Sequence, residues 1–308
     1  MGFSTRNQRG FDGKGNYVID IIIPTYRRIE LLKRVLPYYL KQRNVGIIII
    51  VEDGPLSPEV AALALEASQP RIIAIATGHQ SGAPAAKALG LQHAVSELVA
   101  FGEDDAFPAP DYYTGLAAHL DAGRADVIAG VVHYLSSIDD AWKTGTIALI
   151  ENRPSFGVTN EMGGLIQCAA TQALYLGRRD LLLRYLPDSG FGGNGWREET
   201  DPQLRMWSDG KKIALDPSAI FYHLPRAYQK GGGQHARSRL AYEYWCLRND
   251  MCFFRRHHAS LSRLGFRGPA LFFALMQSVG RLGHKIATRV RPAKRPRTVV
   301  LPRLGDEA

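Results

Sequence analysis

The chain has 308 residues, of which 45% are hydrophobic and 22% are charged, and its formal net charge is +9. This length suits one large domain or one domain with an appendage, and the composition is that of a globular protein with a substantial core. The three cysteines are scattered and show no CxxC spacing, which argues against a disulfide framework or a zinc site and favours a reducing compartment.

The N-terminal arm, residues 1–17, contains no apolar segment of the kind found in secretory signals. Position 6 also lacks the Ser or Thr of a myristoylation signal. We therefore expect a cytoplasmic protein.

After the arm, short apolar runs alternate with stretches of helical spacing. The runs are rich in β-branched residues and predict buried strands at 18–23, 46–51, 71–76 and 97–101. The stretches between the runs predict helices at 28–43, 58–68 and 83–95. This alternation predicts an α/β fold with a mostly parallel central sheet flanked by helices.

The second half is less regular. The apolar run 165–176 predicts a strand, and a glycine-rich loop at 190–201 ends in acids. A short helix follows, with Asp201 expected as its N-cap, Pro202 at its first position and Gly210 as its stop. The remaining patterns predict two strands joined by a turn at 211–223 and helices at 236–290. We divide the chain into a main domain, 18–225, and a helical C-terminal extension, 226–308.

The positive charge is concentrated in this extension. Residues 251–308 contain twelve Lys and Arg against two acids, whereas residues 1–250 contain 26 basic and 27 acidic residues. The Pro- and Arg-rich tail, 291–308, is expected to be poorly ordered. Nucleic-acid binding is not favoured, because the basic residues form a tail and not a groove with interleaved aromatic residues.

An apolar segment at 269–279 has basic flanks. It is too short to span a bilayer, which takes about 20 apolar residues. A basic amphipathic helix of this kind is typical of an anionic membrane surface, although a helix packed on the main domain with solvated charges has the same pattern. We expect a peripheral contact of residues 269–297 with the inner face of the cell membrane.

Polar and charged residues follow each predicted strand of the first half. They are PTYRR (24–28), EDG (52–54), TGHQSGAPAAK (77–87) and GEDD (102–105). Ligands of open α/β sheets bind beyond the carboxyl ends of the strands, so chemistry is expected here. GxGxxG and GxxxxGK[ST] motifs are absent, which argues against a dinucleotide fold and a P-loop.

Three adjacent acids, Glu103, Asp104 and Asp105, end the fourth predicted strand. Carboxylates suit Mg²⁺ or Mn²⁺, and a divalent cation offsets their mutual repulsion. A solvated acidic turn explains the cluster equally well on its own. The buried strand before it and the acids Glu52 and Asp53 after a neighbouring strand favour a metal and nucleotide site.

Two further glutamates, Glu198 and Glu199, lie just before a predicted helix, whose dipole favours the ionised form that a general base needs. Helix capping is the alternative, and it accounts for Asp201 better than for the glutamates. His223 ends a predicted strand and becomes a metal ligand only if it meets the acids, since a lone histidine is more often structural. Lys87 can contact phosphate, although a surface lysine is the commoner case.

Together the segments 18–28, 48–54, 82–91, 98–113 and 196–223 resemble a family 2 glycosyltransferase of the GT-A fold, over about residues 18–225. The sequence REETD resembles a subgroup that has EETD where many relatives have EDxD. The resemblance implies an inverting hexosyltransferase that uses Mn²⁺ or Mg²⁺ and a nucleotide-sugar donor, with UDP-sugars the commonest. The acceptor of such an enzyme is often a lipid-linked or polysaccharide glycan.

The resemblance also implies roles for individual residues. Asp53 reads the base of the donor, Lys87 lies near the base and diphosphate, and Asp104 lies near the ribose or metal. Glu199 is the catalytic base with Glu198 beside it. The nucleotide pocket is lined by Pro24, Thr25, Tyr26 and Arg27, and the metal is held by Asp105, Glu103 and His223.

The sequence departs from the family pattern at three positions. Glu103 replaces the usual first Asp, Ala88 stands where Asn is common, and Glu199 replaces an Asp. These departures affect the fine geometry expected of the site.

Two other functions are compatible with the pattern. A sugar nucleotidyltransferase shares a related α/β layout, but it would normally carry a Gly-rich motif after the first strand, which PTYRR is not. A pseudoenzyme that binds sugar nucleotides and scaffolds a membrane complex is the non-enzymatic alternative.

Overall fold

The computed structural model describes residues 17–66, 71–135, 146–151, 160–162, 164–224, 238–290 and 297–300. Almost all of the N-terminal arm, the boundary expected near residue 225 and most of the tail after residue 290 lie outside this part of the chain.

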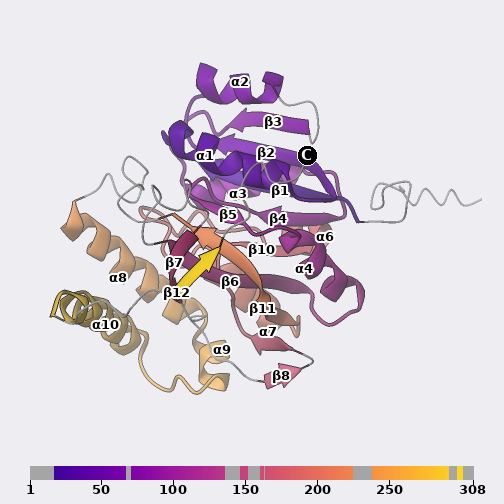
Figure 1. The fold of residues 1–308 in the computed structure, drawn as a ribbon. Helices are drawn as coiled ribbons and strands as arrows, with labels where there is room; N and C mark the ends of the chain where they lie inside the picture. The colour runs from indigo at the N-terminus through magenta and orange to yellow at the C-terminus, as the bar shows by residue number, and fades with distance from the viewer. Residues whose placement is uncertain are drawn as a thin grey trace, which may run out of the picture.

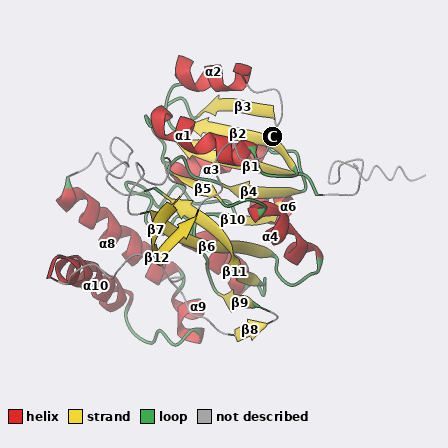
Figure 2. Cartoon of the chain, in the orientation of Figure 1, coloured by secondary structure: helices red, strands yellow, loops and turns green. Residues whose placement is uncertain are grey.

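A twelve-stranded sheet runs through the molecule with helices around it (Figures 1 and 2). Its main path has the order β3-β2-β1-β4-β10-β6-β11-β9-β8. From β3 to β11 the strands run in one direction, except β10. The sheet is therefore mostly parallel at its centre, as the sequence predicts. The strands of this stretch are β3 (Arg71–Ala76), β2 (Val45–Glu52), β1 (Ile19–Thr25), β4 (Leu98–Phe101), β10 (Tyr175–Arg178), β6 (Val127–Leu135) and β11 (Ile213–His223).

The other strands are antiparallel additions. β9 (Leu165–Cys168) pairs with β11, and β8 (Asn160–Met162) pairs with β9. β5 (Ala106–Pro108) also pairs with β11. β7 (Thr146–Glu151) pairs with both β6 and β12 (Arg297–Val300).

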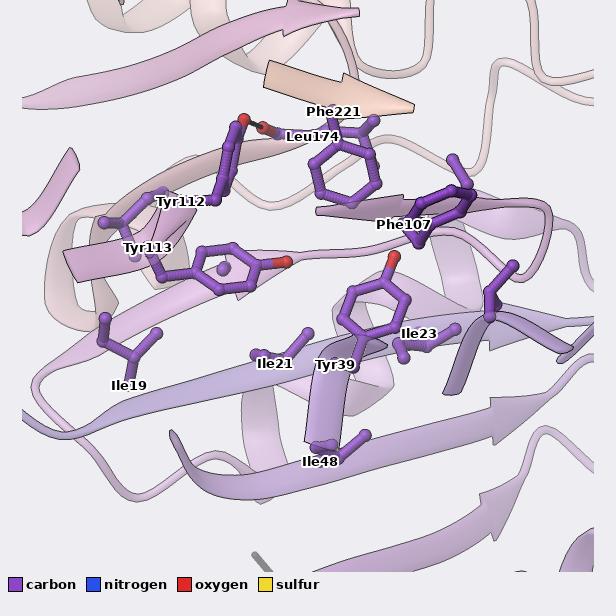
Figure 3. Close-up of a cluster of buried hydrophobic side chains, with 14 of the residues drawn as sticks. Ile19, Ile21, Ile23, Tyr39, Ile48, Phe107, Tyr112, Tyr113, Leu174 and Phe221 are labelled. Carbon is purple, nitrogen blue, oxygen red and sulfur yellow. Dashed lines mark hydrogen bonds between the residues drawn. The ribbon is translucent and has the colours of Figure 1, made fainter. Parts of the chain in front are cut away.

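The side chains of β1 alternate between two cores because successive residues of a strand point to opposite faces. Ile19, Ile21 and Ile23 join a core with helices α1 (Ile29–Leu40) and α4 (Tyr112–Asp121), shown in Figure 3. Ile22 joins the core on the other face. That core includes residues of α3 (Ala83–His93), α6 (Arg179–Arg184) and α7 (Thr200–Ser208). Helix α2 (Pro58–Glu66) lies beside the edge strand β3.

Asp20, on β1, is fully buried and ties three segments together. Its carboxylate accepts hydrogen bonds from the backbone N–H of Ile47 at 3.1 Å and of Val95 at 2.7 Å. It also accepts from the backbone N–H and the hydroxyl of Ser96, each at 2.8 Å. This carboxylate therefore holds β1 against β2 and against the turn that leads into β4.

Replacing Asp20 by Ala is expected to lower the free energy of unfolding by about 3–5 kcal/mol, because several buried donors would lose their acceptor together. Urea titration measures the change. Asp180→Ala is the control, since the Asp180 side chain is 74% exposed. A loss below about 1 kcal/mol for Asp20→Ala would show that the carboxylate does not have this role.

The second half departs from expectation in three places. The apolar run 165–176 forms two strands, β9 and β10, which pair with different partners. Residues 213–223 form one continuous strand, β11, whose register shifts between Asp216 and Ile220 where a turn was expected. Asp201 lies inside α7 and does not cap it. Its buried carboxylate instead meets Arg205, Arg256 and His257.

The C-terminal part is helical, as the sequence predicts, and consists of α8 (Arg239–Arg256), α9 (His258–Arg263) and α10 (Ala270–Val290). α8 and α10 pack together, and α10 lies outermost, on the side of α8 away from the sheet (Figure 1). None of the described helices is long and apolar enough to cross a lipid bilayer.

Candidate active site

A pocket opens at the carboxyl ends of β1, β2 and β4, where the α/β layout predicts a ligand. Its wall is formed by the four segments that follow β1, β2, β3 and β4, by the glycine-rich loop 190–195 and by the end of β11. The lining residues are Pro24, Thr25, Tyr26, Arg28, Asp53, Gln80, Gly82, Ala83, Pro84, Lys87, Glu103, Asp104, Asp105, Phe191, Gly192, Gly193, Asn194, Gly195, Glu198 and His223.

Asp104 and Asp105 are held from one side by Arg28. The guanidinium donates to both oxygens of Asp104 and, at 2.8 Å, to Oδ2 of Asp105. The hydroxyl of Thr25 donates to Asp104 at 2.7 Å. Asp104 is thus anchored by Thr25, at the end of β1, and by Arg28, in the loop that follows. Asp105 is held by Arg28 through Oδ2 only, and its Oδ1 faces His223.

Glu103, Asp105 and His223 form the acidic corner of the pocket. One possible ligand atom of each lies within 4.8 Å of the others. Nε2 of His223 lies 3.4 Å from a Glu103 oxygen and 3.6 Å from Oδ1 of Asp105. Burial lowers the pKa of His223, but the two carboxylates raise it more, so the net pKa is about 9. At neutral pH a protonated imidazole therefore compensates the two acids.

Lys87 is buried, contrary to the common case of a surface lysine. It comes from α3 and forms an ion pair with Glu198 at 2.5 Å, with both side chains less than 10% exposed. Burial lowers the pKa of Lys87, whereas Glu198 and then Glu103 raise it more, so the lysine stays charged. The second oxygen of Glu198, Oε2, is buried and has no hydrogen-bond partner within the described part of the chain.

Glu199 lies next to this ion pair but does not line the pocket. It precedes the first residue of α7, and its side chain makes no capping hydrogen bond. Burial and then the charge of Glu198 raise the pKa of Glu199 to about 7. The two adjacent glutamates therefore differ, because Glu198 is fixed by a lysine and Glu199 titrates near neutral pH.

Asp53 lines the pocket from the end of β2 and also organises the loop before α3. Its carboxylate accepts from the backbone N–H of Ser81 at 2.6 Å and of Gly82 at 2.9 Å. Glu52, the other acid of this pair, turns away and accepts from the backbone N–H and hydroxyl of Ser57. Only one acid of the pair therefore faces the pocket.

The two arginines of PTYRR have different positions. Arg28 lines the pocket, whereas Arg27, the predicted pocket residue, does not. Arg27 adopts a φ of 54°, in the left-handed region that residues other than Gly, Asn and Asp seldom occupy. This turn of the backbone directs Arg28 to the acids.

Arg28, Gln80 and Asn194 line the pocket but are not among the site residues predicted from the sequence. A signal existed for Arg28, because it belongs to the PTYRR segment that follows the first predicted strand. Gln80 and Asn194 lie in loops without periodicity, and no sequence pattern distinguishes them.

The glycine-rich loop is held in place by the C-terminal helices. Gly193 has a φ of 71°, and a Cβ on it would lie 2.0 Å from the ring of Trp245 on α8, so this contact requires glycine. The amide of Asn194 donates to Sγ of Cys246, and the amide of Asn249 donates to the carbonyl of Gly192. α8 therefore forms the support of one pocket wall.

Asp250 extends this support to the two glutamates. It is fully buried and accepts from the indole N–H of Trp196 at 2.9 Å and from Arg197 at 2.8 Å. Arg281 of α10 donates to its other oxygen at 2.7 Å. The segment that leads into Glu198 and Glu199 is thus connected through Asp250 to both α8 and α10.

The fold is that of the GT-A glycosyltransferases. The family model "Glycosyl transferase family 2" matches residues 20–186, more than half of the chain. The chain therefore belongs to glycosyl transferase family 2. No curated protein sequence matches it.

Solved structures of low sequence identity share the fold. GalNAc-T7, solved with UDP, GalNAc and Mn²⁺, is 13% identical with a TM-score of 0.54 over 70% of this chain. TarS of S. aureus is 14% identical with a TM-score of 0.53 over 77% of this chain. TarS 1–349 with UDP-GlcNAc is 12% identical with a TM-score of 0.55, also over 77%. The matches cover 44%, 40% and 66% of those three chains, respectively.

Proposed function

We propose that the protein is a metal-dependent, inverting hexosyltransferase that moves a sugar from a nucleotide-diphosphate donor, a UDP-sugar by preference, to an acceptor hydroxyl. One observation carries this proposal. A trio of possible metal ligands and a buried Lys–Glu pair lie in the same pocket, at the edge of the sheet where a donor is expected. The UDP and UDP-GlcNAc in the similar structures support the choice of donor.

The pocket residues divide between the two ends of the donor. We assign Pro24, Thr25, Tyr26 and Asp53 to the nucleoside, because they line the pocket at the ends of β1 and β2. We assign Lys87 and Arg28 to the diphosphate, where cations stabilise the charge that develops on the leaving group. Arg28 takes the place of Arg27 in this assignment.

The residues of the acidic corner fit a divalent cation. Their donor set, two carboxylates and an imidazole, suits Mn²⁺ and to a lesser degree Mg²⁺, and Oδ1 of Asp105 faces His223 and away from Arg28. Glu103, Asp105 and His223 would hold the ion. When bound, it would supply Lewis-acid stabilisation of the leaving diphosphate.

Asp105→Asn is expected to weaken Mn²⁺ binding at least about tenfold, because a charged ligand is lost. Electron paramagnetic resonance of free Mn²⁺ measures this change without any substrate. Asp180→Asn, an exposed acid away from the pocket, serves as the matched control. Equal Mn²⁺ affinity of Asp105→Asn and wild type would remove the ion from this corner.

For the chemical step, Glu199 takes the proton of the acceptor hydroxyl while the hydroxyl oxygen attacks the anomeric carbon opposite the leaving diphosphate. A single displacement of this kind inverts the anomeric centre. A pKa of about 7 suits a general base at neutral pH. The position of Glu199 outside the donor pocket is consistent with a base that meets the acceptor. Glu198 fixes Lys87, and its other oxygen, Oε2, is buried without a hydrogen-bond partner among the described residues.

The acceptor that we propose is a lipid-linked or polysaccharide glycan. We also assign the chain to the subgroup with EETD, on the basis of residues 198–201. The catalytic unit would comprise residues 18–225 together with the helices that follow. The inclusion of these helices is supported by the contacts of α8 with the loop 190–197 and by Arg281 of α10, which lies over the ring of Trp196.

A thermal-shift screen with UDP, GDP, dTDP and their sugars, with and without Mn²⁺, tests the proposal. A ligand that binds only the folded state raises the apparent stability. We expect one nucleotide class to shift the midpoint, and Mn²⁺ to enlarge that shift. No shift with any nucleotide would contradict donor binding. Binding without turnover would favour the pseudoenzyme.

A further inference from the structure

Helix α10 exposes a row of large apolar side chains. Leu271, Phe272, Leu275, Met276 and Val279 are between 46% and 68% exposed. At about 100° per residue this spacing places them within an arc of about 140°. Exposed apolar residues that are scattered singly are normal, but a contiguous face of this kind marks an interaction surface.

The opposite face of α10 is firmly attached to the protein. Ala274 is fully buried, and the ring of Phe273 stacks on Phe254 of α8 with centroids 5.5 Å apart. Arg281 donates to Asp250 and lies over the ring of Trp196. The helix is therefore apolar on both faces over its first turns, but its packing against α8 uses only one of them.

The charge around this face is strongly positive. The sequence contains no acid from residue 251 to residue 305, a span that includes all of α9 and α10. Arg263 and Arg267, which precede α10, are exposed. The acids of α8 that approach α10, Glu243 and Asp250, are paired with Arg281. An apolar face on a segment with exposed basic and no acidic residues complements an anionic lipid surface, where each basic residue contributes attraction. A symmetric contact between two copies through this face would instead bring like charges together.

We propose that this face, Leu271, Phe272, Leu275, Met276 and Val279, docks α10 in the plane of an anionic lipid bilayer. Because Arg281 and Asp250 link α10 to Trp196 and Arg197, the docked helix belongs to the same packed unit as one wall of the pocket. If the proposed transfer reaction holds, docking brings the pocket to a lipid-borne acceptor. The lipid contact itself does not depend on that reaction.

Vesicle flotation of the full chain tests the docking. The probes are phosphatidylcholine vesicles with and without phosphatidylglycerol. We expect the wild type to float with the anionic vesicles and the double variant Leu275→Glu, Met276→Glu to lose at least about tenfold in partitioning. Leu65→Glu is the matched control, since Leu65 is 88% exposed and belongs to α2, a helix far from α10 (Figure 1). It should float like the wild type.

Three results would overturn the proposal. They are absence of wild-type flotation, equal flotation of the double variant, and equal flotation with neutral and anionic vesicles. If the wild type does not float but sediments as a dimer, and only the double variant sediments as a monomer, the face binds a second copy of the chain instead. Val279→Glu is a second variant, and unchanged urea midpoints show that both variants fold. Nucleotide-induced thermal shifts of the same samples report the proposed function separately, because flotation needs no donor.

Discussion

Glu199→Gln is expected to lower kcat about a thousandfold while the donor affinity stays within about twofold of the wild type. General-base catalysis contributes about 10²–10⁴-fold, and a carboxamide cannot accept the proton. Glutamine keeps the size of the side chain, so the structure should be preserved. Quantifying nucleoside diphosphate under saturating donor measures kcat, and calorimetric titration measures affinity. Glu30→Gln is the control, since Glu30 is 82% exposed on α1.

The pH profile provides an independent check of this residue. Burial and Glu198 raise the pKa of Glu199 to about 7, so the proposed base is protonated below that pH. We therefore expect kcat/KM to fall as pH decreases through about 7 and to level off above it. The residual activity of Glu199→Gln should not show this fall in kcat/KM at low pH. Near-normal activity of Glu199→Gln together with an inactive Glu198→Gln would identify Glu198 as the base.

Lys87→Met is expected to lower the free energy of unfolding by about 3–5 kcal/mol, because it leaves the buried Glu198 carboxylate without its counter-charge. Loss of the cation should also weaken nucleoside diphosphate binding. Urea titration and calorimetry measure the two effects.

The double variant Lys87→Met, Glu198→Gln separates the two effects. It should recover much of the stability, because no buried charge is left unpaired, but none of the affinity. A single-variant loss below about 1 kcal/mol would show that the pair is not coupled in the folded protein.

Local pattern was sufficient to predict the fold from β1 to β4. Runs of β-branched residues marked β1 to β4, and polar residues directly after them marked the edge where Asp53, Lys87 and the acids 103–105 meet. This worked because parallel strands with short connections place their carboxyl ends together, so sequence position determined spatial position.

Long-range contacts were not predictable from the same patterns. The run 165–176 divides between two places in the sheet, a choice made by pairing with β4, β6 and β11. Asp201 has the sequence context of a cap, but Arg256 and His257, more than fifty residues away, bind it inside the helix.

The support of the loop 190–197 is also a long-range feature. Asp250 and Arg281 lie 53 and 84 residues after Arg197, and nothing in their local sequence indicates that they reach it. Arg28 was missed for a local reason, since only the left-handed backbone at Arg27 decides which arginine faces the acids.

The central claim, transfer of a sugar from a nucleotide-diphosphate donor, is tested most directly by product analysis. The wild type is incubated with UDP-, GDP- and dTDP-sugars and Mn²⁺, with simple glycosides or water as acceptor, and nucleotides are separated by liquid chromatography. We predict release of free nucleoside diphosphate from one donor class, and its loss in Asp105→Asn and Glu199→Gln. Formation of nucleoside triphosphate on addition of pyrophosphate, without release of nucleoside diphosphate, would contradict the claim and identify a nucleotidyltransferase.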